Sequence, residues 1–177
     1  MRKISIEKTG ITDIATDAIV NAANEALQAG SGVCGAIFRA AGYDELQEAC
    51  DRIGHCDTGS AVITPGYKSK AEYIIHAVGP RWYGGNKGEP RKLYECYKNS
   101  LRLAKENSIH SICFPLISTG VFGYPSDDAW DVAVRACRDF LDEERDYVIR
   151  IIFAVPEEGK YRQGVRALND LDIGKQS

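Results

Sequence analysis

Residues 17–24 read Asp-Ala-Ile-Val-Asn-Ala-Ala-Asn, and this stretch decides the fold. Its short apolar run, residues 17–20, is typical of a strand buried on both faces. The run leads into a glycine-rich loop of small residues, 21–35, and a helix is predicted over residues 35–41. A buried strand, a polar loop and a helix in succession indicate an α/β protein.

The same succession recurs along the chain. Further strands are predicted over residues 2–8, 60–64, 73–78, 111–117 and 147–155, and further helices over 43–53, 90–107, from Ser126 onward and 157–171. We expect Ser126 to cap its helix, because serine oxygens satisfy free N–H groups at helix starts. Alternating strands and helices predict an α/β sandwich whose mostly parallel sheet is covered on both faces.

Length and composition limit the class of protein. The 177 residues, 44% of them hydrophobic and 27% charged, predict a single globular domain over residues 1–177 and exclude a disordered or collagen-like chain. With 22 basic and 25 acidic residues the net charge is 22 − 25 = −3, which argues against a general nucleic-acid binder. We find no signal peptide and no apolar run of membrane-spanning length, so we expect a cytoplasmic monomer that uses no membrane.

Two glycine-rich loops follow buried strands and precede helices. The first reads Gly30-Ser-Gly-Val-Cys-Gly35 and the second Ser118-Thr-Gly-Val-Phe-Gly123. Glycines allow the backbone to approach a ligand closely, and a helix N-terminus offers unpaired N–H groups to an anion. In parallel sheets, ligands bind beyond the carboxyl ends of the strands. The loops therefore predict a clamp for two phosphates, although tight turns without a ligand are the simpler alternative.

The two asparagines between the strand and the loop are expected to have different roles. Asparagine amides supply donors and acceptors that suit sugar hydroxyl groups. We expect Asn21 to be structural and Asn24 to face a ligand, with Phe122 as an apolar wall. A diphosphate clamp, an amide and an apolar wall together predict a pocket for a nucleotide diphosphate sugar.

The six cysteines are scattered without a CxxC pair and are expected to be reduced and half-buried. The group Cys50-x4-His55-Cys56 fits no standard zinc spacing, so no metal site is predicted. His76 lies in a buried strand and is expected to be a core or supporting histidine. Trp82 and Tyr83 either cover the pocket or form an exposed aromatic loop.

Four segments together resemble the signature of the macrodomain family. They are residues 17–24, 30–37, 75–80 and 115–123, they occur in the family's order, and the resemblance extends over residues 3–168. It implies a three-layer α/β/α sandwich with a mixed, mostly parallel central sheet that binds ADP-ribose. The branch it resembles most is the hydrolase branch, which removes ADP-ribose from acidic side chains or deacetylates O-acetyl-ADP-ribose.

The resemblance also implies site residues. By position, the two glycine loops hold the diphosphate through N–H groups, Asn24 bonds the proximal ribose beside Phe122, and Ile11 offers backbone to adenine. The implied ligand-binding set is Ile11, Asn21, Gly32, Val33, Cys34, Ser118, Thr119, Gly120, Val121, Phe122 and Pro156. The implied catalytic set is Asn24, Cys34 and Gly35. The implied partner is ADP-ribose or an ADP-ribosylated protein, and no cofactor is expected.

The chain departs from the family pattern at three positions. Cys34 stands where the hydrolase branch usually has aspartate, Gly10 where an aspartate bonds the adenine amine, and Pro156 where an aromatic ring stacks on adenine. We expect weaker or altered adenine recognition, and slow hydrolysis through a water that a thiol orients poorly. Two alternatives stay open: a module that binds ADP-ribosylated proteins without cleaving them, and a binder of a different nucleotide or sugar phosphate.

Overall fold

The computed structural model describes residues 3–176, with side chains described up to residue 172. The strands are β1 (Ile4–Glu7), β2 (Ala18–Ala23), β3 (Ala61–Pro65), β4 (Tyr73–Val78), β5 (Ser111–Phe114) and β6 (Arg150–Ala154). The helices are η1 (Ile11–Asp13), α1 (Gly32–Ala41), α2 (Tyr43–Ile53), α3 (Glu89–Glu106), α4 (Ser126–Glu143) and α5 (Glu158–Gln176). Met1, Arg2 and Ser177, which the predicted domain of residues 1–177 includes, lie outside the described residues.

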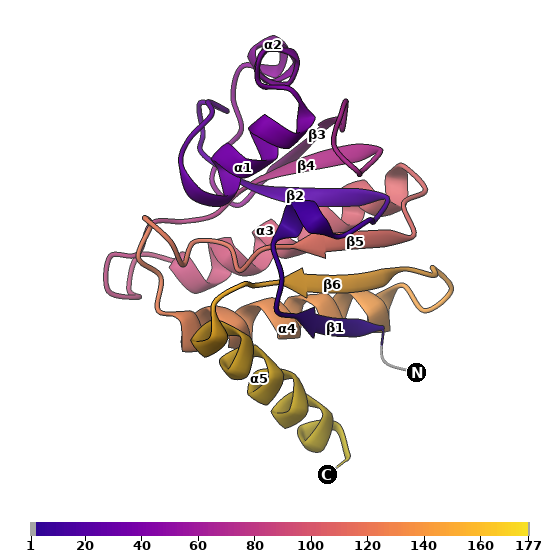
Figure 1. The fold of residues 1–177 in the computed structure, drawn as a ribbon. Coiled ribbons are helices and arrows are strands. Elements are labelled where there is room, and N and C mark those ends of the chain that lie inside the picture. The colour runs from indigo at the N-terminus through magenta and orange to yellow at the C-terminus, as the bar shows by residue number, and fades with distance from the viewer. Residues whose placement is uncertain (1–2, 177) are drawn as a thin grey trace.

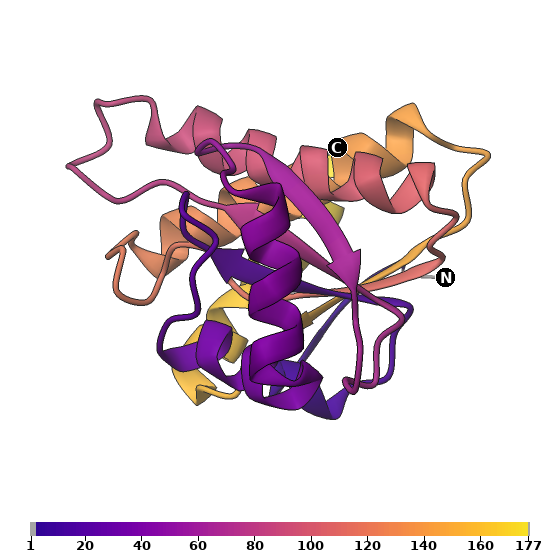
Figure 2. The ribbon, with the colours of Figure 1, turned by 90° about the horizontal axis from the view of Figure 1, so that it is seen from above.

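The six strands form one sheet in the order β1-β6-β5-β2-β4-β3 (Figure 1). Every neighbouring pair is parallel except β3 and β4, which run antiparallel at one edge. Helices α1 and α2 lie on one side of this sheet and α3 on the other, as the view from above shows (Figure 2). The predicted three-layer α/β/α sandwich with a mixed, mostly parallel sheet is therefore confirmed.

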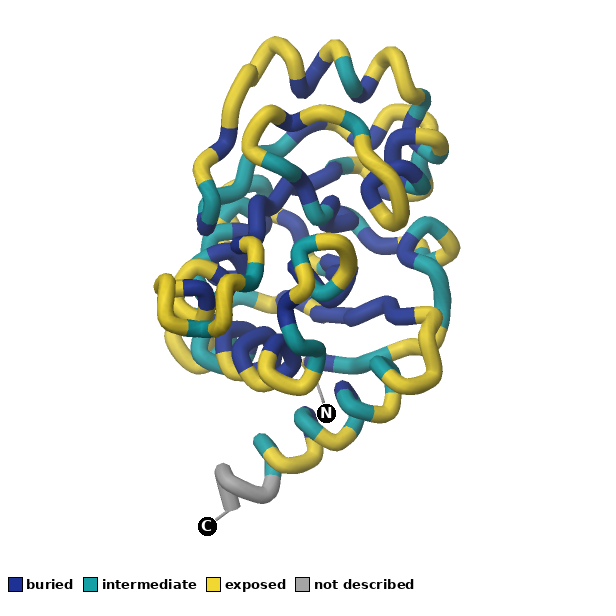
Figure 3. Tube along the Cα trace, turned by 90° about the vertical axis from the view of Figure 1, so that its left-hand side faces the viewer, coloured by how far each residue is buried: buried dark blue, intermediate teal, exposed yellow. Residues whose placement is uncertain are grey.

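Side chains alternate along the central strands between two hydrophobic cores. In β4, Ile74 faces the core beneath α1 and α2, whereas Ile75 faces the core beneath α3 and α4. In β6, Ile152 and Ile151 divide in the same way. Since both faces are covered, the middle of the sheet is buried and the exposed residues lie on outer helices and loops (Figure 3).

Several element ends differ from the sequence prediction, and β2 and α5 both extend further, to Ala23 and Gln176. The fifth strand ends at Phe114 rather than residue 117, because Pro115 has no N–H to continue the ladder. The last strand begins at Arg150 rather than residue 147, and α1 begins at Gly32 rather than Gly35. Ser126 is not a cap: it is the first residue of α4, and Pro125 occupies the N-cap position without a side-chain bond.

Helix α5 packs against α4 and beside β1, at the edge of the sheet. Its close contact depends on Gly164, where an added Cβ would lie 2.5 Å from Cζ2 of the buried Trp130. The indole N–H of Trp130 also donates to the carbonyl of Lys160 at 2.9 Å. The indole therefore fixes the first two turns of α5 relative to the rest of the fold. Among the described residues, we find no helix whose length and apolar character would let it cross a bilayer.

Gly164→Ala should destabilise the protein because the new methyl group overlaps the Trp130 ring. Overpacking of this kind costs about 1–3 kcal/mol, more than the helix propensity that alanine adds. Gly159→Ala, on the same helix, is the matched control, since a Cβ there meets nothing within 4 Å. Denaturant unfolding measures both variants, and equal stability of the two would contradict the packing described for Trp130.

Candidate functional site

A cavity of about 410 Å³ opens at the carboxyl ends of β2, β5 and β6. That volume lies within the usual range for a small-molecule site. Both glycine-rich loops contribute to its wall, as the position of the loops along the sequence predicted. The lining residues are Ala22, Ala23, Asn24, Gly30, Ser31, Gly32, Val33, Cys34, Gly79, Pro115, Leu116, Ile117, Ser118, Thr119, Gly120, Val121, Phe122, Ala154, Val155, Pro156, Glu157 and Lys160.

Three predicted site residues do not line this cavity. The side chain of Ile11 is 4% exposed and packs into the core beneath α1, so the predicted contact with adenine, through the Ile11 backbone, stays a prediction. Asn21 is buried below the cavity floor. Gly35 lies inside α1, where an added Cβ would sit 2.7 Å from the carbonyl oxygen of Gly30. The lack of a side chain lets helix and loop approach each other here, and the catalytic role of Gly35 stays a prediction.

The first loop presents the N-terminus of α1 to the cavity. Gly32 opens the helix with a φ of +61°, a left-handed conformation that favours glycine. Ser31, in the N-cap position, makes no side-chain cap bond. The first N–H groups of a helix have no intrahelical partner. Those of the Gly32–Cys34 turn are therefore available to an anion in the cavity.

The second loop carries backbone strain at Ser118. This residue has a φ of +72°, which is costly for a side chain larger than hydrogen. Its Oγ is buried and, among the described residues, has no hydrogen-bond partner. Gly79 makes the arrangement possible, because an added Cβ there would lie 2.2 Å from that oxygen. A strained backbone and an unsatisfied hydroxyl at a cavity wall are typical of a binding site.

Asn24 reaches the cavity wall but is already bonded. Its Oδ1 accepts the N–H of Gln28 at 3.0 Å, and its Nδ2 donates to the Gln28 carbonyl at 2.9 Å. An amide has a second lone pair and a second N–H. Asn24 can therefore bond a ligand while the local turn holds it in a fixed orientation.

Phe122 is supported from outside the cavity. The Arg81 guanidinium lies 4.5 Å from the centre of the Phe122 ring, and the backbone N–H of Trp82 donates to the Phe122 carbonyl at 2.9 Å. Trp82 is half-buried against Tyr124, with ring centres 4.6 Å apart, and Tyr83 is 66% exposed. Neither Trp82 nor Tyr83 lines the cavity. Tyr83 therefore belongs to an exposed aromatic loop, as one of the two predicted alternatives states, and Trp82 supports Phe122.

Glu89 organises the loop that supports Phe122, and the sequence pattern did not single it out. Its carboxylate accepts the N–H groups of Tyr83, Gly85 and Lys87 at 2.6–2.9 Å. Burial raises the pKa of Glu89, but these N–H donors outweigh burial and lower it to about 2. An acidic residue at a helix start is common, so no sequence signal distinguishes this one.

Beneath the floor, a neutral His76 orients Asn21. The ring Nδ1 accepts from Asn21 Nδ2 at 3.1 Å, and Nε2 donates to Thr64 Oγ1 at 2.9 Å. Burial lowers the pKa of His76 to about 4, so the ring is uncharged at neutral pH. These contacts agree with the predicted supporting role of this histidine.

Cys34 lines the cavity as a protonated thiol. Burial raises its pKa, and contacts with Gly30 and Asn21 offset this only in part. Since the thiolate is the nucleophilic form, the cavity surroundings do not activate this cysteine.

The six cysteines are buried and unpaired, deeper than the half-buried state predicted. His55 is exposed and bonds Asp57 at 2.7 Å rather than approaching Cys50. In the part of the chain that the structure describes, one group of metal-capable atoms lies together, from the exposed Glu25, His55 and Asp57. The absence of a metal site stays a prediction.

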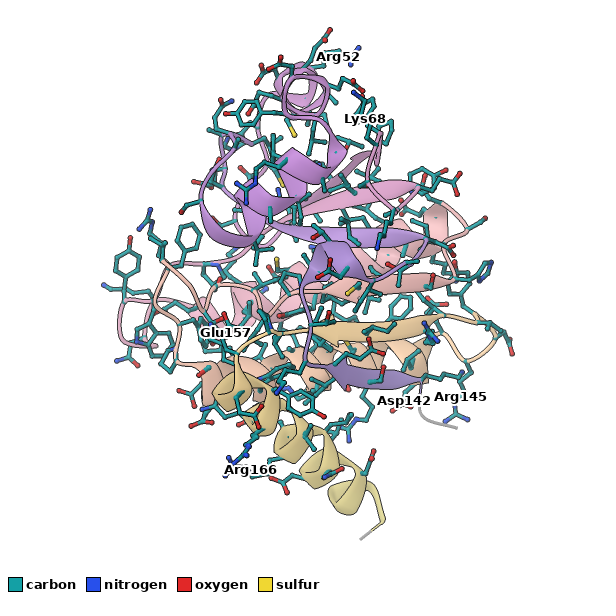
Figure 4. The ribbon with its side chains drawn as sticks, in the orientation of Figure 1. Arg52, Lys68, Asp142, Arg145, Glu157 and Arg166 are labelled. Atoms are coloured by element: carbon teal, nitrogen blue, oxygen red, sulfur yellow. The ribbon has the colours of Figure 1, made fainter. Side chains whose placement is uncertain are left out.

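Two charged residues of the cavity wall were not predicted from the sequence. Glu157 lies directly before α5, between this helix and β6, and lines the cavity (Figure 4). Lys160 lies in the first turn of the same helix, and its Nζ donates to Thr119 Oγ1 at 3.3 Å. Neither carries a motif, because only the tertiary packing of α5 brings them to the second glycine loop.

The pKa of His76 predicts a pH dependence of folding. Because the unfolded ring has a pKa near 6.5 and the folded ring about 4, the unfolded chain binds the proton first. Stability should fall by about 3 kcal/mol as the pH drops from 6.5 to 4. Urea unfolding across this range measures the slope, which His76→Gln should reduce and the exposed-site control His55→Gln should keep. An unchanged slope in the His76 variant would contradict the assignment.

Comparison with known proteins agrees with this geometry. Residues 20–133 match the family model described as "Macro domain". A macro domain-containing protein of Chlorobaculum tepidum is 51% identical over 146 residues, covering 82% of this chain and 84% of its own length. The protein of Xenopus laevis named ADP-ribose glycohydrolase MACROD2 is 46% identical over 169 residues. The match covers 95% of this chain but only 40% of that relative.

Solved structures show the same fold. The Oceanobacillus iheyensis macrodomain with ADP has a TM-score of 0.88 at 37% identity, over 96% of this chain and 91% of that one. The Trypanosoma brucei macrodomain in complex with ADP-ribose has a TM-score of 0.88 at 38% identity, over 94% of this chain and 69% of that one. With a cavity formed by two N–H-rich loops at the expected edge of the sheet, this chain belongs to the macrodomain family.

Proposed function

We propose that the protein binds ADP-ribose and hydrolyses ADP-ribosyl esters by means of a positioned water. The substrates are mono-ADP-ribosylated aspartate or glutamate side chains, O-acetyl-ADP-ribose, or both. The observation that carries this proposal is the pair of loops, at Gly32 and Ser118, that line one cavity and whose N–H groups suit an anion. The glycohydrolase names of the MACROD relatives and the ADP-ribose complex of the Trypanosoma brucei macrodomain support it.

The chemistry would proceed without an activated thiol. Cleavage at the anomeric carbon builds positive charge on the sugar, which a nearby diphosphate stabilises. Asn24, held by its bonds to Gln28, would orient the ribose beside a water. Because the pKa of Cys34 is raised, its thiol fills space and is not the nucleophile. Hydrolysis would be slow, because the Cys34 thiol orients a water less well than the usual carboxylate would.

Asn24→Ala should abolish release of ADP-ribose, because the ribose loses its orienting amide. Gln28→Ala is the matched control, since the Asn24 contacts involve only the Gln28 backbone. The assay follows free ADP-ribose released from a mono-ADP-ribosylated acidic substrate, with thermal unfolding as the check on folding. Full turnover by the Asn24 variant would sink the catalytic assignment.

Cys34→Ser should keep turnover within about threefold of the original protein, since a protonated thiol is not the nucleophile. Loss of activity in this variant, with ADP-ribose binding preserved, would show that the thiol takes part in the reaction.

Two further functions are supported by particular residues. A binding module without hydrolysis is favoured by Cys34, which stands where the hydrolase branch has a carboxylate. The release assay decides between the two, because only an enzyme turns over its substrate many times. A different nucleotide ligand is favoured by Pro156, an exposed residue of the cavity wall that stands where the family has an aromatic ring on adenine.

Calorimetric titration with ADP-ribose should therefore give a dissociation constant weaker than micromolar. Without a stacked aromatic ring at Pro156, the base loses a contact of about 1–3 kcal/mol. Pro156→Phe should tighten binding, whereas the control Pro65→Phe, at an exposed proline that does not line the cavity, should not. A sub-micromolar constant for the unaltered protein would count against weakened adenine recognition.

The proposal also includes a monomeric state and a cytoplasmic location. Light scattering of the purified protein and fractionation of cells test these two points directly.

A further inference from the structure

Lys160 has an unusual place among the charged side chains around α5. Among the described residues that line the cavity, it is the one with positive charge. The neighbouring cations Lys8 and Arg162 both pair with Glu158, at 2.7 Å each. No carboxylate of the described residues forms such a pair with the ammonium of Lys160. The acidic Glu157 lies on the same cavity wall, but among the described residues it forms no ion pair with this ammonium.

The contact that Lys160 does make leaves it free to bond a ligand. The Thr119 hydroxyl, which donates to the Leu116 carbonyl at 2.8 Å, accepts one N–H of the ammonium. A lysine ammonium has three N–H donors. Thr119 belongs to the strained loop whose N–H groups face the cavity. An anion held by that loop would lie within reach of the remaining donors.

The backbone of Lys160 is held in place by the core, so the position of its side chain beside Thr119 follows from the packing of α5. Trp130, fully buried in α4, donates its indole N–H to the Lys160 carbonyl. Gly164, one turn further along α5, packs its Cα against the same ring. The ammonium therefore extends from an anchored helix turn toward the second glycine loop.

From this geometry we propose that Lys160 is a ligand-binding residue that contacts the phosphate oxygens held by the Ser118–Phe122 loop. The inference rests on the proposed function, because it requires a phosphate-bearing ligand in the cavity. It adds a charged contact, from a helix the glycine motifs do not include, to a clamp built from backbone N–H groups. A hydrogen bond between two charged groups is stronger than one between neutral groups.

Titration calorimetry with ADP-ribose tests the inference on three variants of the full chain. Lys160→Met should weaken binding about tenfold, Lys160→Arg should retain most of the affinity, and Arg162→Met should bind like the original protein. The Arg162 control removes a cation from the same helix, outside the cavity. Affinity should also depend less on ionic strength in Lys160→Met than in the original protein. Thermal unfolding of each variant checks that the fold is kept.

The outcomes separate this inference from the function it rests on. If the original protein binds no ADP-ribose, the proposed function fails and the inference fails with it. If the original protein binds and Lys160→Met binds within twofold of it, the function stands and the inference is overturned. Equal weakening by methionine and arginine, with unchanged salt dependence, would also overturn it, because the role of Lys160 would then be structural.

Discussion

The rest of this structure depends on two loops that line one cavity and whose helix-start and turn N–H groups can bond an anion. Both loops can bond one anion together only if other contacts hold them in place. At the first loop, Gly32 adopts a left-handed conformation and α1 begins with its free N–H groups toward the cavity. At the second loop, Ser118 is strained in the same sense. An anion in the cavity would bond both loops at once.

The surroundings hold each loop rigid. Gly79 leaves room for the Ser118 side chain, and Glu89 gathers three N–H groups of the loop that supports Phe122. Under the floor, the uncharged His76 fixes Asn21. Glu89 and His76 do not line the cavity, whereas Gly79 does. Each reduces the freedom of a wall that has to match a small molecule, which lowers the entropic cost of binding.

The charge balance of the chain has a similar explanation. A net charge of −3 argues against long polyanions, whose binding requires many lysines and arginines. A single diphosphate requires only oriented N–H groups, so the overall charge is no obstacle to the proposed ligand. The one cation of the described cavity wall, Lys160, comes from α5 rather than from either glycine loop.

Much of the site was predictable because it depends on local chain geometry. Loops after parallel strands meet at one edge, so residues such as Asn24, Gly32 and Phe122 fall on one wall. What failed depends on tertiary packing. Ser126 is not a cap, because Pro125 occupies the N-cap position, and the six cysteines are more deeply buried than predicted. Lys160 and Glu89 were missed because their partners lie in loops whose path no periodicity reveals.

The most direct test of the two-loop anion clamp is an NMR titration with ADP-ribose that follows the backbone amide resonances of the whole chain. The largest shifts should fall on the amides of residues 32–35 and 118–123, and both groups should saturate at one ligand concentration. Shifts confined to one loop, or spread over residues remote from the cavity, would contradict a single site formed by both loops.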